Sequence, residues 1–319
     1  MIAIIIQQVI IMTLLSTVGF VMYKTHKIGN EGSKNIGNIL IFLSLPCVII
    51  NGFLVEYSTE RLIGLGISAL LALIVLLLSM LISRICLGRN AIDNFGASFS
   101  NAGFFGVPFI LATISNGAVF YVASFIAFLN LFQWTYGVFL LKNSDEKGML
   151  VKNNGGEKRS GGAKKIALSF IKAPFMIAII IGLLFFFTQI QMPAIIGKCI
   201  KYIADVNTPL AMFTIGIYAA QTKLGKMLLK PRLYWVSAVR LVIIPIITIL
   251  LLKFLPIDNS ELKNCILIAS ACPIGSNVAV YAQLHNKNYT YAVETVVIST
   301  ILSIATLPGI MALANLLHM

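Results

Sequence analysis

Charged residues are scarce in this chain: they make up 11% of its 319 residues, and only 11 positions are acidic. Hydrophobic residues, by contrast, make up 58%. A soluble domain carries about a quarter charged residues and needs no such apolar excess to form a core. The composition therefore excludes an ordinary soluble protein and predicts an all-α protein that crosses a membrane several times.

Metal ligands and catalytic motifs are also few. The chain has three His and five Cys, and neither type is placed at metal-ligand spacing, so the sequence predicts no metal site. The HExxH, P-loop and GxSxG patterns are absent, which argues against a membrane-bound hydrolase and an ATP-driven pump. The sequence predicts that the protein is not an enzyme and holds no cofactor.

The apolar residues gather in runs long enough to cross a bilayer, which takes about 20 residues of helix. Ten runs qualify, and they cover 3–23, 36–55, 62–83, 94–115, 118–141, 166–188, 203–222, 233–254, 262–284 and 290–316. The sequence therefore predicts ten transmembrane helices in contact with lipid.

The basic residues that produce the net charge of +13 are concentrated in the connections between these runs. Of the 24 Lys and Arg residues, 18 lie in or beside odd-numbered connections, five lie in even-numbered ones, and Arg240 lies well inside a run. Because basic loops remain in the cytoplasm, this pattern predicts a protein of the cytoplasmic membrane with both termini outside and no nucleic-acid partner. The basic stretch 142–165 is interpreted as a cytoplasmic linker, with contact to anionic lipid headgroups as the alternative.

The linker divides the chain into 1–141 and 166–319, with five runs in each half. Since five is odd, a duplication places the second copy in the opposite orientation, as an inverted repeat. Weak internal similarity agrees with this interpretation: LSLPCVIINGF in the second run and VNTPLAMFTIGI in the seventh align Pro46 with Pro209.

Two segments within the fourth and ninth runs are rich in helix-interrupting residues. They read SFSNAGFFGVPFI at 98–110 and ASACPIGSNVAVYAQ at 269–283. Non-helical backbone at this depth is tolerated where it is buried in protein or lines a polar cavity. The start of each new half-helix exposes N–H groups and partial positive charge. We interpret the pair as an anion-binding site for transport; the alternative is that Pro and Gly only kink packed helices.

The candidate substrate-binding residues come from these two segments and from the matching breaks in the second and seventh runs. They are Ser100, Asn101, Gly103, Pro108, Pro273, Gly275, Ser276, Asn277, Pro46 and Pro209. Both segments contain the pair Ser-Asn, and each Asn amide could donate to a carboxylate without adding a fixed charge.

Polar residues inside other runs are candidates for the transport pathway. Arg240 and Glu294 have similar depths in the eighth and tenth runs, so they either form a pair or share a path for a coupling H+ or Na+. The alternative is that both reach the membrane interface independently. Asn130 and Gln133 share one helix face and either line the pathway or bond neighbouring helices.

The chain resembles the auxin efflux carrier family over nearly its whole length. The motifs already quoted carry the likeness, together with FLNLFQWTYG, APFMIAIIIGLLF, VRLVIIP and VVISTILSIATLP in the same order. The family includes bacterial malate and malonate permeases and resembles the plant PIN auxin transporters. The likeness implies a five-plus-five inverted repeat of ten helices, with spans four and nine broken where they cross beside the substrate.

The same resemblance implies elevator-like alternating access, a small organic anion as substrate, and contact between Asn101 and the substrate carboxylate. Ser276, Asn277 and Ala173 depart from the pattern of the relatives. Three alternatives stay open: a sodium-coupled symporter of the bile-acid type, an anion channel and a membrane-embedded enzyme. A homodimer is also left open.

The charge pattern predicts the topology. In a background without native cysteines, a single cysteine at Asn153 should be protected from an impermeant thiol reagent in intact cells, because it lies in the basic linker. A cysteine at Asn116, in an even-numbered connection, should be labelled. The reverse pattern of labelling would contradict the assigned orientation.

Overall fold

The computed structural model describes residues 2–115, 117–145, 172–222 and 224–317, and every regular element in these ranges is a helix. Within these described ranges, seven helical segments are long and apolar enough to cross a membrane. They cover Ile6–Lys24, Asn30–Phe53, Thr59–Leu87, Val119–Lys142, Ala194–Gln221, Pro231–Phe254 and Tyr289–Leu316. The expected all-helical, multi-pass membrane protein is confirmed, while the number of ten spans and the inverted repeat stay predictions.

Several of the segments are built from shorter α-helices joined by π-helical turns, which carry the label η. The first half of the chain contains α1 (Ile2–Lys24), α2 (Asn30–Ile39), η1 (Leu40–Ser44), α3 (Leu45–Phe53), α4 (Thr59–Leu87), α5 (Ala91–Ser98), η2 (Ala102–Gly106), α6 (Val107–Thr113), α7 (Val119–Phe132), η3 (Gln133–Gly137) and α8 (Val138–Lys142). The second half contains α10 (Pro174–Thr188), α11 (Ala194–Asp205), α12 (Asn207–Gln221), α13 (Leu224–Met227), α14 (Pro231–Ala238), η4 (Val239–Ile243), α15 (Ile244–Phe254), α16 (Ser260–Ala271), α17 (Asn277–Leu284) and α18 (Tyr289–Leu316).

In the part of the chain that the structure describes, three of the four π-helical turns directly precede a proline. The helices that follow η1, η2 and η4 carry Pro46, Pro108 and Pro245 at their first or second positions. A proline ring collides with the carbonyl of the preceding turn and offers no N–H to it. The wider π-turn accommodates the ring, so the segment continues across the membrane with a local irregularity instead of ending.

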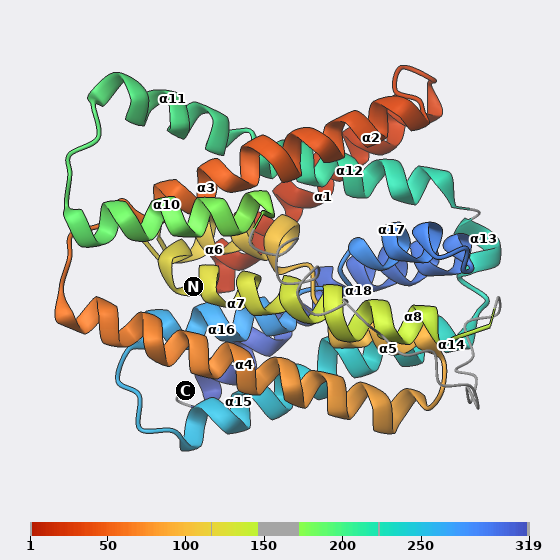
Figure 1. Cartoon of the computed structure of the whole chain (residues 1–319). Coiled ribbons are helices and arrows are strands. Elements are labelled where there is room, and N and C mark those ends of the chain that lie inside the picture. The colour runs from red at the N-terminus through yellow and green to blue at the C-terminus, as the bar shows by residue number, and fades with distance from the viewer. Residues whose placement is uncertain (1, 116, 146–171, 223, 318–319) are drawn as a thin grey trace, which may run out of the picture.

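The helices form two bundles. The first bundle contains α1, α2, η1, α3, α10, α11 and α12, with α1 packed along α12 and with α3 against α10 and α11. The second bundle contains α4 to α8 and α14 to α18, with η2, η3 and η4; in it, α4 packs against α5 and α7, and α18 packs against α14 and α17. Figure 1 shows most of the first bundle above the second. Each bundle therefore draws helices from both halves of the sequence.

The two bundles meet along α1, α3 and α12 on one side and η2, α7 and α18 on the other. This interface brings the broken fourth segment of the sequence against the first bundle. Gly103 in η2, one of the expected site residues, lies close to the side chain of Leu45 in α3.

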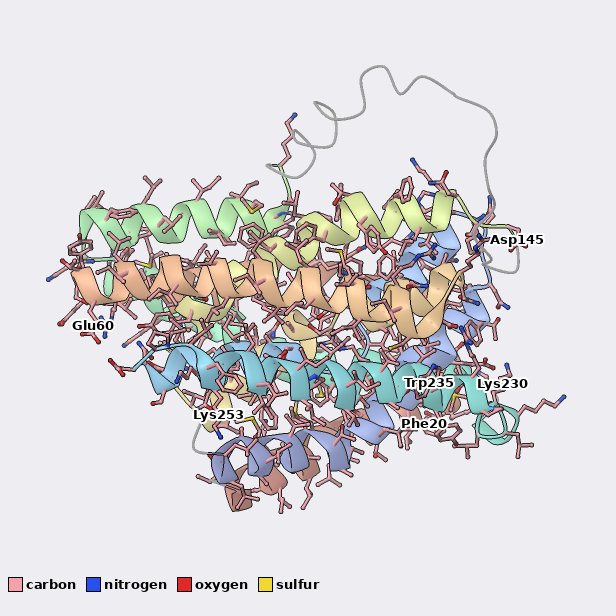
Figure 2. All side chains as sticks on the ribbon, turned by 90° about the horizontal axis from the view of Figure 1, so that it is seen from below. Phe20, Glu60, Asp145, Lys230, Trp235 and Lys253 are labelled. Carbon is pink, nitrogen blue, oxygen red and sulfur yellow. The ribbon has the colours of Figure 1, made fainter. Side chains whose placement is uncertain are left out.

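Charged side chains gather at the two ends of the helical body. Figure 2 shows Glu60 and Lys253 at one end and Asp145 and Lys230 at the other, with the lengths of the helices between them. Large apolar side chains are exposed on the helix flanks, as for Ile85, which is 72% exposed. Soluble monomers rarely leave such surfaces in water, so these flanks indicate a lipid environment.

The packing of α1 on α12 brings the two backbones into direct contact. Gly216 of α12 lies against Ser16 and Phe20 of α1, and a methyl group added at Gly216 would lie 2.8 Å from the backbone nitrogen of Phe20. Only a residue without a side chain permits this approach.

Gly216→Ala should therefore destabilise the protein by about 1–3 kcal/mol, because overpacking forces the backbones apart. Gly66→Ala in α4 is a matched control: a methyl group there meets open space, and helix propensity favours alanine by about 0.5–1 kcal/mol. Thermal unfolding in detergent measures both variants. Equal melting temperatures would contradict the close contact.

Candidate functional site

The site begins where two helices of the second bundle stop. α5 ends at Ser98, and Phe99 is extended, with φ −120° and ψ 114°. α16 ends at Ala271, and Cys272 is extended, with ψ 151°. Cys272 precedes Pro273, and a residue before proline is forced out of helical geometry. The sequence therefore ends α16 at this position.

The two extended stretches lie side by side in opposite directions. Ser100 and Ile274 form an isolated antiparallel bridge. The amide of Asn101 donates to the carbonyl of Pro273 at 2.8 Å, and the amide of Gly275 donates to the carbonyl of Phe99 at 3.0 Å. We call residues 98–101 and 272–276 the crossing.

Glycine at position 275 allows the two stretches to approach this closely. A methyl group there would lie 3.0 Å from the Ser100 carbonyl oxygen and 3.3 Å from that of Phe99. The backbone of Ile274 is held from the other side by the Ser299 hydroxyl of α18, which accepts its N–H at 3.1 Å. At both breaks, backbone hydrogen bonds across the crossing thus replace bonds that the interrupted helices lose.

New helices start on the far side of each break. η2 starts at Ala102 and continues as α6, and α17 starts at Asn277. The first amides of a helix have no acceptor in a preceding turn and carry partial positive charge. Asn101 and Ser276 occupy the positions just before these two starts, so the helix starts of both segments belong to the crossing.

Polar atoms at the crossing are buried without protein partners. The side-chain amide nitrogen of Asn101 and the hydroxyls of Ser98 and Ser100 lack any hydrogen-bond partner among the described residues. Asn101 is only 5% exposed. Since buried polar groups in native proteins are almost always bonded, these atoms are available to a bound ligand.

Asn277, Gln133 and Asn130 take different positions. The side-chain nitrogen of Asn277 donates to the side-chain oxygen of Gln133 at 2.7 Å, which joins α17 to η3. Asn130 donates instead to the carbonyl of Ile126 in its own helix, at 2.8 Å. The structure thus brings Gln133 to the crossing through Asn277, while the amide of Asn130 is bonded within α7.

Arg240 is 1% exposed and lies against the carboxyl ends of α5 and α16 at the crossing. Its Nε donates to the carbonyl of Cys272 at 3.1 Å, and its Nη1 donates to those of Ala97 at 3.1 Å and Ser98 at 3.4 Å. Its Nη2 donates to the carbonyl of Ser270. One guanidinium therefore binds the carboxyl ends of both α5 and α16.

Glu294 does not pair with Arg240, contrary to the pairing considered from their matched depths. Its carboxylate lies 2.6 Å from the ammonium nitrogen of Lys230. Similar positions along two runs of sequence do not say which way each side chain points around its helix.

Pro46 and Pro209 lie outside the crossing, in the first turns of α3 and α12 of the first bundle. Pro108 lies in the first turn of α6 and lines a cavity of about 230 Å³ between the bundles. The mouth of this cavity carries the ion pair of Lys201 and Asp205, 2.8 Å apart and more than half exposed. In the sequence, Lys201 counts only as a loop charge and gives no sign of this pairing.

A second cavity of about 230 Å³ lies between α1 and α12 of the first bundle and η2 and α18 of the second. Its walls include Met12, Met212, Val297 and Phe105, the last from the broken fourth segment. The two cavities indicate that the interface between the bundles is loosely filled in two places.

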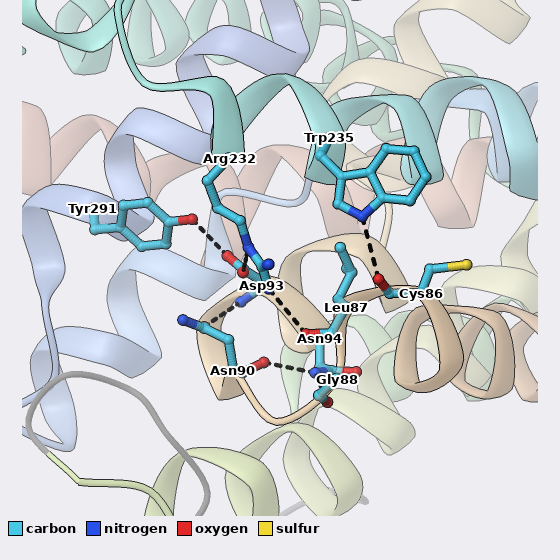
Figure 3. A network of polar contacts seen from close by, with 9 residues as sticks. All are labelled: Cys86, Leu87, Gly88, Asn90, Asp93, Asn94, Arg232, Trp235 and Tyr291. Atoms are coloured by element: carbon cyan, nitrogen blue, oxygen red, sulfur yellow. Dashed lines mark hydrogen bonds and ion pairs between the residues drawn. The ribbon is translucent and has the colours of Figure 1, made fainter.

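A polar network joins α5, α14 and α18 at one end of the second bundle (Figure 3). The Asp93 carboxylate, 0% exposed, accepts from Arg232 Nε and from the Tyr291 hydroxyl, each at 2.7 Å. Asn90 caps α5 by accepting the Asp93 amide at 3.0 Å. This network was not predicted, because Asp93 stands just outside an apolar run and its partners are distant in sequence.

The burial of this network predicts an unequal effect of its two charges on stability. Arg232→Gln should cost about 3–5 kcal/mol, because it leaves the buried Asp93 carboxylate without its cation. Asp93→Asn should cost only about 1 kcal/mol, because the Arg232 side chain is 48% exposed and can turn to water. Thermal unfolding of the two variants in detergent measures the difference, and a larger loss for Asp93→Asn would contradict it.

Comparison with known proteins agrees with this architecture. A family model described as "Membrane transport protein" matches residues 4–311. A protein of Rhizobium meliloti (strain 1021), named "Putative malonate transporter", is 22% identical over 310 residues, which is 92% of this chain and 92% of that protein. The chain therefore belongs to the membrane transport protein family, the auxin efflux carrier family that its motifs indicate, and it is a transporter and not an enzyme.

Proposed function

We propose that the protein is a secondary active carrier for a small organic anion, and that it holds the anion's carboxylate at the crossing. The observation that carries this proposal is the buried, unpartnered amide of Asn101 beside two helix starts. The relative named as a malonate transporter supports a carboxylate as the anion. The lipid bilayer is the protein's working environment, and a homodimer stays a prediction.

Electrostatics favour an anion at this place. The starts of η2 and α17 each contribute the equivalent of about half a positive charge. At α17 the amides of Val278 and Ala279 already donate to the carbonyls of Gly275 and Ser276, at 3.1 Å each, so the donors left for an anion are chiefly the side chains. Asn101 adds two amide hydrogens, and Asn277 keeps one of its two after donating to Gln133. These neutral donors can bind a carboxylate and also release it, as a carrier requires.

The two bundles suggest how the anion crosses the membrane. The crossing belongs entirely to the second bundle, and the cavities lie between that bundle and the first. Movement of the second bundle against the first would carry the bound anion past the fixed helices, in the manner of an elevator. The cavity lined by Pro108, Lys201 and Asp205 is also bordered by Gln8, near the start of α1, so it would serve as one entrance.

Purified protein in liposomes tests the function. Uptake of a radiolabelled dicarboxylate such as malonate should saturate with concentration and should show counterflow, which a channel does not support. A panel of carboxylates in a thermal-unfolding assay should contain at least one that raises the melting temperature, because a ligand bound to the folded state stabilises it. Absence of both binding and flux across the panel would contradict the proposal.

Asn101→Ala should weaken carboxylate binding by roughly 10- to 150-fold, because a hydrogen bond to a charged group contributes about 1.5–3 kcal/mol. Asn130→Ala is the matched control: its amide is bonded inside its own helix, so affinity should stay the same. Titration calorimetry on both purified variants measures the change. If folded Asn101→Ala protein binds as tightly as the parent, the carboxylate is held elsewhere.

A further inference from the structure

The crossing has a negative side as well as a positive one. α5 and α16 both end there, and the last carbonyls of a helix have no amide from a following turn. The carboxyl end of each helix carries the equivalent of about half a negative charge. Two such ends meeting inside a membrane therefore leave several unbonded carbonyls and about one negative charge.

A single arginine, Arg240, both donates to the unbonded carbonyls and offsets their negative charge. The donors of Arg240 reach the carbonyls of Ala97 and Ser98 at the end of α5, and those of Ser270 and Cys272 at the end of α16. One guanidinium charge matches the sum of the two helix ends. Its planar fork of five N–H groups also fits several acceptors at once, which the compact ammonium group of lysine does not.

In other carriers with broken helices, the carboxyl ends of the half-helices form a cation site. There, unwound backbone carbonyls and the carboxyl ends of half-helices coordinate the coupling cation. In this protein those carbonyls already accept from a guanidinium that is 1% exposed. A sodium ion would have to displace four hydrogen bonds and would share the site with a permanent positive charge.

We infer that Arg240 is a built-in cation that takes the place of a coupling sodium ion, so that the carrier binds its anion without sodium. The inference rests on the proposed function and decides between its two candidate coupling ions, against Na+. It also assigns Arg240 as a positioning residue: it touches no substrate but holds the two helix ends so that the helix starts beyond them face the anion.

The first test uses the unaltered protein. Its melting temperature, its affinity for the transported carboxylate and its initial rate of uptake should be the same in sodium chloride, potassium chloride and choline chloride at equal ionic strength. A bound sodium ion would raise the melting temperature in sodium chloride alone. A sodium-specific rise in melting temperature, affinity or rate would overturn the inference.

The second test removes the cation and returns it from solution. Arg240→Ala should melt at a lower temperature and should transport at least about tenfold more slowly, the loss expected from a single hydrogen bond to a charged group. Millimolar guanidinium chloride should restore part of both quantities, because it fits the vacated space between the carbonyls. Sodium chloride should restore neither. Arg240→Lys, which keeps the charge but has fewer donors, should fall between the two.

Arg84→Ala is the matched control, because Arg84 is an exposed arginine that donates to the carbonyl of Gly88. It should melt and transport like the parent, and guanidinium should not change it. Unaltered stability and transport in Arg240→Ala would overturn the inference, as would restoration by sodium. If Arg240→Ala cannot be recovered folded, the sodium measurements on the unaltered protein still decide.

The melting experiments separate this inference from the proposed function, because they need no substrate. Guanidinium that raises the melting temperature of Arg240→Ala, in a protein that binds no carboxylate, would uphold the built-in cation and refute the anion carrier. Carboxylate transport that depends on sodium would do the opposite.

Discussion

Backbone that leaves a helix in the buried interior of a protein finds no water to bond, and the crossing is arranged around that constraint. The crossing meets it with three kinds of partner. The backbone amide of Asn101 donates to the carbonyl of Pro273, and the hydroxyl of Ser299 accepts from the amide of Ile274. The guanidinium of Arg240 donates to the carbonyls at the two helix ends. The side-chain nitrogen of Asn101 and the hydroxyls of Ser98 and Ser100 are left without partners among the described residues, and this imbalance makes the place suited to a ligand.

The breaks themselves could be predicted from sequence because their causes are local. Pro273 forces Cys272 out of the helix, and the cluster of Ser, Asn and Gly near position 100 offers no strong helix former to bridge the gap. The multi-pass helical architecture was equally accessible, since hydrophobic runs report on lipid directly. Asn101 was proposed as a site residue on other grounds, namely the Ser-Asn pair repeated in both broken segments and the family resemblance.

The partners of the buried charges could not be predicted, because they depend on the arrangement of helices around one another. Sequence gives the depth of Arg240 and of Glu294 but not the direction in which each side chain points. The structure turns Arg240 toward backbone carbonyls and Glu294 toward Lys230. Backbone carbonyls have no signature in the sequence at all, so an arginine that binds four of them looks the same as one that awaits an acidic partner.

The division of the sequence into halves also differs from the division of the molecule into bundles, and this difference bears on transport. The crossing needs one broken segment from each half, so α5 and α16 must lie in the same bundle, together with the η4 turn that supplies Arg240. The guanidinium and the carbonyls it neutralises therefore stay together whatever the second bundle does relative to the first. An anion bound at the helix starts would travel with its own positive partners and would leave no exposed negative helix end behind it. A mobile sodium ion at the same carbonyls would have to load and unload in step with the substrate, whereas a covalently attached cation meets the same electrostatic requirement in every position of the bundle.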